Sequence, residues 1–304
     1  MAILVTGGAG FIGKQWAEWL AMNGNSVTVL DNLSGAPKPD FNNKIEFFKG
    51  DILNQKDLDA VFSNGKFERV DHLAAHPHVK ESAGRPVEFF NNNSVGTFNL
   101  LESCRKYGVS HISFTSTSTV YGLAEKIPTP EDAPLLPISN YGSTKMAGEA
   151  MLMSYASTYG MRATIFRLAN IVGPTATHGV IPDFVAKLKK NPKKLEILGN
   201  GTQKKSYLFI DDLLSGFEIA LAKGGNKGVF VYNVGSEEQL TTLEIAKTVS
   251  REMGLTPEFR FSGKTRAGWI GDVPDMLLDV KKLKALGWQP KVRGKDIIKK
   301  CIRR

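Results

Sequence analysis

Short apolar runs alternate with longer amphipathic segments along the first two thirds of this 304-residue chain. The runs have the length of buried strands, whereas the segments between them repeat apolar residues at the spacing of one helix face. Strands are predicted at residues 2–5, 26–30, 45–49, 70–74, 111–115 and 163–167, and helices after residue 13, over 86–107 and over 141–159. This alternation predicts an α/β fold with a doubly wound parallel sheet and helices on both faces.

The rhythm changes after Gly173-Pro174. A loop, a basic helix over 182–190 and a strand near 195–198 come next, before an apolar helix over 210–222 and a buried strand over 229–234 return to the first pattern. Helices and short strands fill the remainder. The chain is therefore expected to have a main domain, 1–172 plus 207–235, and a smaller discontinuous lobe, 173–206 plus 236–304.

A glycine-rich turn, Thr6-Gly7-Gly8-Ala9-Gly10-Phe11-Ile12-Gly13, joins the first predicted strand to the first helix. In a dinucleotide-binding turn, Gly7 would allow the tight turn, Gly10 the approach of a pyrophosphate, and Gly13 close packing of helix on strand. The helix N-terminus would offer free amides and partial positive charge to the phosphates. Asp31 closes the second strand, where a carboxylate binds the adenosine ribose diol. The sequence thus predicts a Rossmann-type domain that binds NAD.

Tyr141 and Lys145 stand one helical turn apart, downstream of the hydroxyl cluster over residues 115–119. Residues four apart share a helix face, so the ammonium can stabilise a phenolate. Lowering a phenol pKa from about 10 to about 7 requires roughly 4 kcal/mol of preferential stabilisation of the anion. Together with the cofactor motif, this pair indicates an enzyme.

Composition narrows the class of protein further. Lys and Arg exceed Asp and Glu by nine, 39 against 30, with the excess concentrated over residues 187–205 and 281–304. Such faces attract anionic small molecules, and since no aromatic residues are interleaved with them, nucleic-acid binding is not expected. No apolar stretch is long enough to span a membrane. The two cysteines, Cys104 and Cys301, have no metal-ligand spacing, so neither a zinc site nor a disulfide framework is expected, and the cytoplasm is the predicted compartment.

These motifs resemble those of the extended short-chain dehydrogenase/reductases, in the branch of sugar-nucleotide epimerases and dehydratases. The resemblance covers essentially the whole chain and is closest to the short UDP-hexose 4-epimerases. It implies bound NAD, a lobe for a UDP-sugar and a homodimer formed through the helices that begin near Pro86 and Tyr141. The matching segments are residues 6–13, 31–32, 51–52, 73–75, 93–97, 116–122, 141–145, 167–174, 199–203, 232–236 and 286–290.

The resemblance also implies roles for individual residues. Tyr141 would be the catalytic base, Lys145 would lower its pKa and bind the nicotinamide ribose, and Thr117 would hydrogen-bond the reacting sugar hydroxyl. NAD would contact those first two and Gly7, Gly10, Phe11, Ile12, Gly13, Asp31, Asn32, Asp51, Ile52, Leu73, Ala74, Ala75, Asn93 and Ser116. The substrate would contact Thr117, Asn170, His178, Val180, Lys205, Arg266 and Asp272.

Two positions depart from the family pattern. Lys205 stands where most relatives have arginine, so a point charge replaces a bidentate fork. The spacing from Arg266 to Asp272 is longer than the usual Arg-x-Gly-Asp. Either departure could accompany a different nucleotide or sugar.

The residues after the first hydroxyls of the cluster indicate the reaction type. By the resemblance, dehydratases and decarboxylases carry an acid there, whereas this chain has Ser118 and Thr119. The expected activity is therefore 4-epimerisation of a UDP-hexose, UDP-glucose or UDP-galactose, through a transient 4-keto sugar. The alternatives are a UDP-N-acetylhexosamine or a UDP-uronic acid as substrate, or a non-catalytic NAD-binding regulatory domain.

Overall fold

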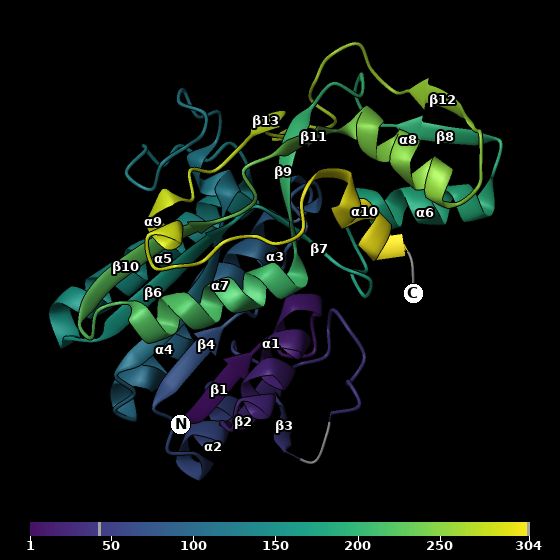
Figure 1. Cartoon of the computed structure of the whole chain (residues 1–304). Helices are drawn as coiled ribbons and strands as arrows, with labels where there is room; N and C mark the ends of the chain where they lie inside the picture. The colour runs from purple at the N-terminus through teal and green to yellow at the C-terminus, as the bar shows by residue number, and fades with distance from the viewer. Residues whose placement is uncertain (42–43, 303–304) are drawn as a thin grey trace.

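The computed structural model describes residues 1–41 and 44–302. A seven-stranded, wholly parallel sheet forms the main body, in the order β10-β6-β5-β4-β1-β2-β3 (Figure 1). Its strands are β1 (Ala2–Thr6), β2 (Ser26–Asp31), β3 (Ile45–Lys49), β4 (Arg69–His72), β5 (His111–Thr117), β6 (Arg162–Leu168) and β10 (Gly228–Val234). The predicted doubly wound parallel sheet is confirmed.

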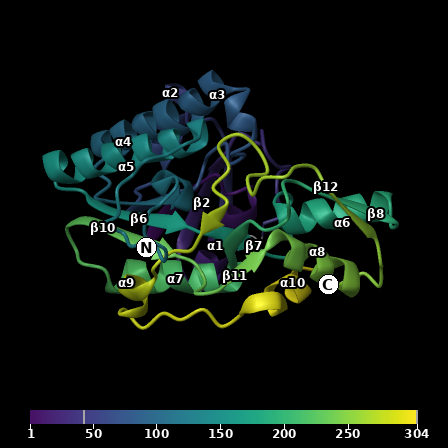
Figure 2. The same ribbon diagram turned by 90° about the horizontal axis from the view of Figure 1, so that it is seen from above.

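Helices cover both faces of this sheet, as Figure 2 shows from above. One face carries α1 (Phe11–Met22) and α7 (Ile210–Lys223), and the other carries α2 (Gln55–Asn64), α4 (Gly96–Lys106) and α5 (Asn140–Tyr159). The predicted helix over 86–107 is present as one helical run, in which α3 (Pro86–Phe90) continues through a π-helical turn (Asn91–Val95) into α4. Short 3-10 turns lie at Glu81–Ala83 and Ser118–Tyr121.

A second set of elements lies beyond the carboxyl ends of β5 and β6 (Figure 1). β9 (Lys204–Phe209) is the centre of a small sheet, in which it pairs with β7 (Asn170–Val172), β11 (Gln239–Thr241) and β13 (Asp275–Met276). The remaining elements are α6 (Val180–Lys190), β8 (Lys194–Ile197), α8 (Thr242–Glu252), β12 (Glu258–Phe261), α9 (Lys281–Lys284) and α10 (Gly294–Ile302).

Alternating side chains of the strands feed two apolar cores. On β1, Leu4 lies in the core under α2, α4 and α5, whereas Ile3 and Val5 lie in the core on the opposite face. This second core continues without a break into the smaller lobe, where it includes Ile245 and Val249 of α8. The two lobes therefore share one hydrophobic core.

Trp16 of α1 shows how the first layer is fixed. Its ring packs edge-on against Phe217 of α7, with centroids 5.4 Å apart, and its indole nitrogen donates to Asp71 at 2.8 Å. Aromatic pairs of this kind contribute about 0.5–1.5 kcal/mol beyond the burial of their area. The contact joins the two helices on one face of the sheet and so fixes α1 beneath the glycine-rich turn.

Candidate active site

The glycine-rich turn has a backbone that other residues do not tolerate. Gly7 has a φ of 71°, in the left-handed region, and a Cβ there would lie 2.5 Å from the backbone nitrogen of Ala74. A Cβ on Gly13 would lie 2.2 Å from the carbonyl oxygen of Gly7. Helix α1 therefore packs directly against the glycine-rich loop. Gly10 is its N-cap residue and offers no side chain to the free backbone amides, and the first helical turn holds no acidic residue. This cradle leaves room and positive potential for a pyrophosphate.

Asp31 lies beside this turn because β2 and β1 are neighbouring strands. One carboxylate oxygen accepts from the Ala9 amide at 2.9 Å, and the other accepts from the Leu33 amide at 2.8 Å. Each oxygen keeps a second lone pair, so the carboxylate is held in place and can still accept from a ribose diol. The cradle and this carboxylate fit NAD.

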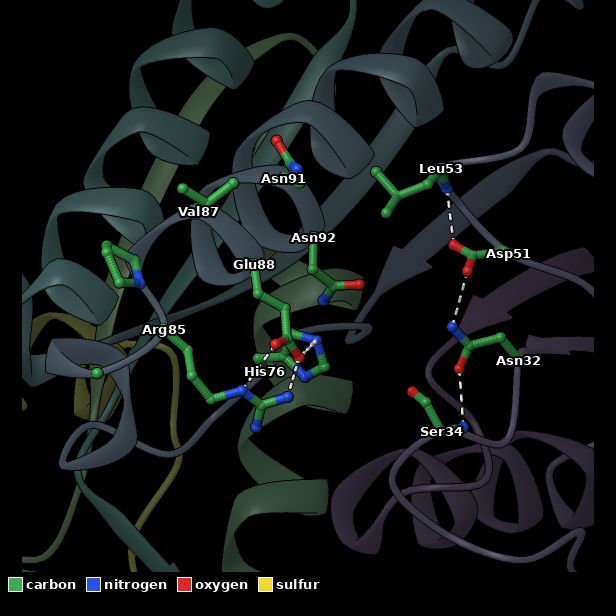
Figure 3. A pocket seen from close by; sticks show the side chains of 12 residues that line it. Asn32, Ser34, Asp51, Leu53, His76, Arg85, Val87, Glu88, Asn91 and Asn92 are labelled. Atoms are coloured by element: carbon green, nitrogen blue, oxygen red, sulfur yellow. Dashed lines mark hydrogen bonds and ion pairs between the residues drawn. The ribbon is translucent and has the colours of Figure 1, made fainter.

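A cavity of about 620 Å³ opens next to Asp31, between the loops that follow β2 and β3 and the start of α3 (Figure 3). On one wall Asn32 donates to Asp51 at 2.9 Å, and Asp51 also accepts from the Leu53 amide at 2.8 Å. Ile52 does not line the cavity but is buried against Gly96 of α4. The cavity adjoins the turn on the side where the adenosine end of a dinucleotide would extend.

The opposite wall of the cavity is a charged cluster. Arg85 and Glu88 of the α3 region form an ion pair, and His76 Nε2 lies 3.2 Å from the Glu88 carboxylate. Burial is the main reason that the pKa of His76 is lowered, although the Glu88 charge raises it. Neither His76 nor this cluster was predicted from the sequence.

Buried hydrogen bonds fix the strand end under the cofactor region. The His72 ring bonds the Thr6 hydroxyl at 2.7 Å and the Thr97 hydroxyl at 2.9 Å, and burial lowers the pKa of His72 to about 3. Asn93 accepts from the His76 amide at 2.8 Å and donates to Thr144 at 3.1 Å. Asn93 thus joins the segment after Leu73-Ala74-Ala75 to α5.

The predicted catalytic residues meet at the end of β5. Thr117 is the last residue of this strand, and its hydroxyl is close enough to the Tyr141 phenol to influence the pKa of that phenol. Helix α5 starts here because Ser139 caps it, accepting from the Gly142 amide at 3.1 Å. Lys145 follows one turn later, with its side chain buried and its ammonium 3.9 Å from the centre of the Phe114 ring.

Burial disfavours the charged forms of both Tyr141 and Lys145. It raises the pKa of Tyr141 to about 12, although the nearby Thr117 hydroxyl partly lowers it. It lowers the pKa of Lys145 to about 7, although the nearby Glu149 carboxylate raises it. A phenolate at neutral pH therefore needs positive charge in addition to Lys145, and the oxidised nicotinamide ring of bound NAD carries such a charge.

Apart from Thr117, the predicted substrate residues lie in or near the smaller lobe. Asn170, on β7, donates to the Ser206 carbonyl at 3.1 Å, and Lys205, on the adjacent β9, pairs with Asp272 at 2.5 Å. Asp272 is buried and also accepts from the Gly268 amide. Arg266 does not pair with Asp272, because its guanidinium donates to Asp275 at 3.1 Å. Lys205 is additionally covered by the Trp269 ring, 5.0 Å from its ammonium.

Two loops meet where His178 contacts His78. The rings are edge to face, with centroids 4.9 Å apart, and Val180 starts α6 two residues later. Burial, followed by the charge of His78, lowers the pKa of His178. The loop after β4 and the loop before α6 therefore lie side by side.

Sequence reasoning missed Glu149 and Arg167, a buried ion pair one turn below Lys145. The signal was available, since Glu149 repeats the four-residue spacing of Tyr141 and Lys145, and Arg167 is a charge inside an apolar strand pattern. Ser116, expected to contact the cofactor, donates its hydroxyl to Glu149.

The described residues hold no group of three or more metal-binding side chains and no helix long and apolar enough to cross a membrane. A glycine cradle, an acidic strand end and a tyrosine-lysine-threonine set together define a dinucleotide-dependent enzyme of the hydride-transfer class. The chain belongs to the NAD dependent epimerase/dehydratase family, whose model matches residues 3–235.

Individual relatives match along nearly the whole chain. A UDP-glucose 4-epimerase of Bacillus subtilis is 33% identical over 318 residues, which cover 96% of this chain and 93% of that protein. The UDP-glucose 4-epimerase of Thermotoga maritima, solved with UDP-glucose, superposes with a TM-score of 0.90 at 33% identity, covering 99% of this chain and 97% of the other. The UDP-glucose 4-epimerase of Thermus thermophilus, solved with NAD, gives the same score and identity, with 99% and 98% covered.

Proposed function

We propose that this chain is an NAD-dependent 4-epimerase of a UDP-hexose, with UDP-glucose and UDP-galactose as its substrates. The observation that carries the proposal is the placement of Thr117, at the end of β5, beside Tyr141, which lies one turn from Lys145 on α5 and on the same edge of the sheet as the glycine cradle. Relatives named UDP-glucose 4-epimerase over the whole length of the chain support it.

In this proposal Tyr141 acts as the general base. Its phenolate takes the proton of the C4 hydroxyl, and the Thr117 hydroxyl donates to the same sugar oxygen or to the phenolate, so that the proton moves along a short path. The chemistry that bound NAD would supply is acceptance of a hydride from C4 and its return to the other face of the ketone. Tyr141 then returns the proton to the oxygen, and the protein is unchanged after one turnover.

The neighbouring side chains favour this reaction over dehydration. Ser118 and Thr119 occupy the positions after Thr117, and the Thr119 hydroxyl lies 3.1 Å from the Thr117 hydroxyl. Neither hydroxyl can protonate a leaving group near neutral pH, because its pKa is far too high. Elimination of water from the keto sugar therefore has no acid at this point, whereas return of hydride needs none.

The test is to incubate the purified protein with UDP-galactose, without added reductant, and to separate the products by chromatography. UDP-glucose should appear, and Tyr141→Phe should convert less than a tenth as fast, since general base catalysis is worth about 10²- to 10⁴-fold. Full activity of Tyr141→Phe would contradict the assigned base. No conversion by protein that holds NAD would exclude this sugar pair, and UDP-N-acetylglucosamine and UDP-glucuronic acid would be assayed next.

We also propose that residues 1–172 and 207–235 bind NAD, and that 173–206 and 236–304 hold the UDP-sugar. In this arrangement Asn170 and Lys205 face the diphosphate from adjacent strands, while Arg266 and the His178 loop contribute from the rim. The compartment is the cytoplasm.

A homodimer is proposed from the surface of the α3–α4 run. Val87, Phe90 and Phe98 are large apolar side chains that are 71%, 55% and 45% exposed there, beside α5. Sedimentation velocity at micromolar concentration should give a dimer, and Phe98→Glu should give a monomer. Met22→Glu, on α1 and 70% exposed, is the matched control. A wild-type monomer at this concentration would contradict the proposal.

A further inference from the structure

The ion pair of Glu149 and Arg167 lies directly beneath the catalytic side chains. Glu149 follows Lys145 by one turn of α5 and Tyr141 by two, and Arg167 lies on β6. Their side chains are 1% and 3% exposed, and Arg167 reaches the carboxylate with Nε at 3.0 Å and Nη2 at 2.7 Å. The geometry is the bidentate fork that fixes both planes relative to one another.

The Glu149 carboxylate has a second partner residue, which lies next to Thr117. Ser116, the residue before Thr117 on β5, donates its hydroxyl to Glu149 Oε1. This buried bond joins β5 to α5, one residue before Thr117 on the strand and two helical turns after Tyr141 on the helix.

Arg167 binds the segment that follows Thr117 in the chain. Its Nη1 donates to the Tyr121 hydroxyl at 2.8 Å and to the Glu131 carbonyl at 2.7 Å, and its guanidinium lies 4.9 Å from the centre of the Tyr121 ring. Tyr121 belongs to the 3-10 turn that follows Thr117. The chain is thus held just before Thr117 and just after it.

A gain in folding stability does not explain why the ion pair of Glu149 and Arg167 is buried here. A buried ion pair costs several kcal/mol of desolvation per ion, and replacing such a pair by apolar residues is often neutral or stabilising. By contrast, a displacement of about 1 Å at reacting groups can cost about 10²-fold in rate. The network therefore has more to contribute to alignment than to folding.

We propose that Glu149 is a positioning residue of the active site, which acts through Ser116 and Arg167 to hold Thr117, at the end of β5, in a fixed position relative to Tyr141 on α5. This inference rests on the epimerase function proposed above. It assigns Ser116 to the alignment of Thr117, and not to binding of the cofactor.

Ser116→Ala is the variant that tests this with the least damage to the fold, because Arg167 keeps its ion pair with Glu149 and no charge is left alone. With NAD-loaded enzyme, kcat should fall about 10- to 100-fold while KM and the NAD released on denaturation stay at wild-type values. Ser113→Ala is the matched control, since Ser113 lies on the same strand and donates to another buried carboxylate, Asp71, at 2.6 Å. Ser113→Ala should lose about as much thermal stability as Ser116→Ala and keep wild-type activity.

A double-mutant cycle separates alignment from general damage. If Ser116 acts through Thr117, then adding Ser116→Ala to Thr117→Val should lower kcat by less than about two-fold, because the aligned group is already absent. If the two substitutions acted independently, the factors by which each lowers kcat would multiply in the double variant. Full multiplication in the cycle, or equal kcat values for Ser116→Ala and Ser113→Ala, would overturn the proposal, and loss of bound NAD from Ser116→Ala would assign Ser116 to the cofactor instead.

Crystal structures of the wild type and Ser116→Ala give a readout that does not depend on turnover. The distance from the Thr117 hydroxyl to the Tyr141 phenol should be longer in the variant than in the wild type. An unchanged distance would refute the positioning role even in a protein that converts no nucleotide sugar. Failure of the epimerase function is recognised separately, because the wild type would then leave all the UDP-sugars tested unchanged.

Discussion

Replacing Lys145 by methionine should stabilise the fold while it abolishes activity. Burial lowers the pKa of Lys145 from 10.5 to about 7 in the folded chain. At about 1.4 kcal/mol per pKa unit, keeping the charged ammonium buried costs roughly 5 kcal/mol. Methionine has a similar length and no charge, so this cost disappears.

Loss of a cation–π contact offsets part of this gain in folding stability. The ammonium lies 3.9 Å from the centre of the Phe114 ring, and a desolvated cation–π contact is worth about 2 kcal/mol. A net stabilisation of roughly 3 kcal/mol remains, which should raise Tm by roughly 5 °C in a chain of this size. The measurement is differential scanning calorimetry of protein freed of NAD, because Lys145 is expected to contact the cofactor.

The pH dependence of the difference in folding stability between Lys145→Met and the wild type gives a sharper test. Between pH 7 and 10.5 the unfolded chain binds the Lys145 proton and the folded chain has lost it, so the stability of the wild type rises with pH across this window. The methionine variant lacks this rise. Its advantage should therefore be full below pH 7 and vanish near pH 10.5.

The control is Lys189→Met, a change at an exposed lysine of α6, which should shift stability by no more than about 0.5 kcal/mol at any pH. A Lys145→Met protein with a lower Tm than wild type at pH 7, or with an advantage that does not change with pH, would refute the reasoning.

Three further outcomes are expected. Gly13→Ala should reduce the NAD that copurifies by at least about ten-fold, measured by absorbance after denaturation, because its Cβ would lie 2.2 Å from the Gly7 carbonyl oxygen; wild-type NAD content would contradict this. Asp31→Ala should weaken NAD binding in calorimetry and reduce the preference for NAD over NADP, since the carboxylate that repels a 2′-phosphate is gone; an unchanged preference would count against its role. Asp272→Asn should destabilise the protein by about 3 kcal/mol in urea unfolding, because it leaves Lys205 without its buried partner; a change below about 1 kcal/mol would show that the pair is dispensable.

Much of the fold could be predicted from the sequence because local patterns determine it. The apolar runs around Leu4 and Ile112 could be buried strands, and the glycine spacing from Gly7 to Gly13 allows few other backbones. Parallel order then brings the strand ends together, so Asp31 and Thr117 could be placed near one another without coordinates.

The polar contacts of the smaller lobe could not be predicted in the same way. Arg266 pairs with Asp275 and Lys205 with Asp272, and these choices depend on how β13 lies beside β9, which no periodicity encodes. The pKa of Tyr141 is a similar case. Spacing to Lys145 predicts stabilisation of a phenolate, whereas the structure adds a desolvation cost that only the packing of the folded chain determines.

The hydrophobic core that runs from Trp16 and Phe217 to Ile245 and Val249 limits how the protein can move. A hinge that separated the lobes as rigid bodies would open this core to water, at about 25 cal/mol for each Å² of apolar area exposed. Any motion that admits a substrate must then come from surface loops and side chains, and not from a hinge between the lobes. For the same reason a chain cut at residue 235, where the family match ends, would lose one side of its own core and should not fold.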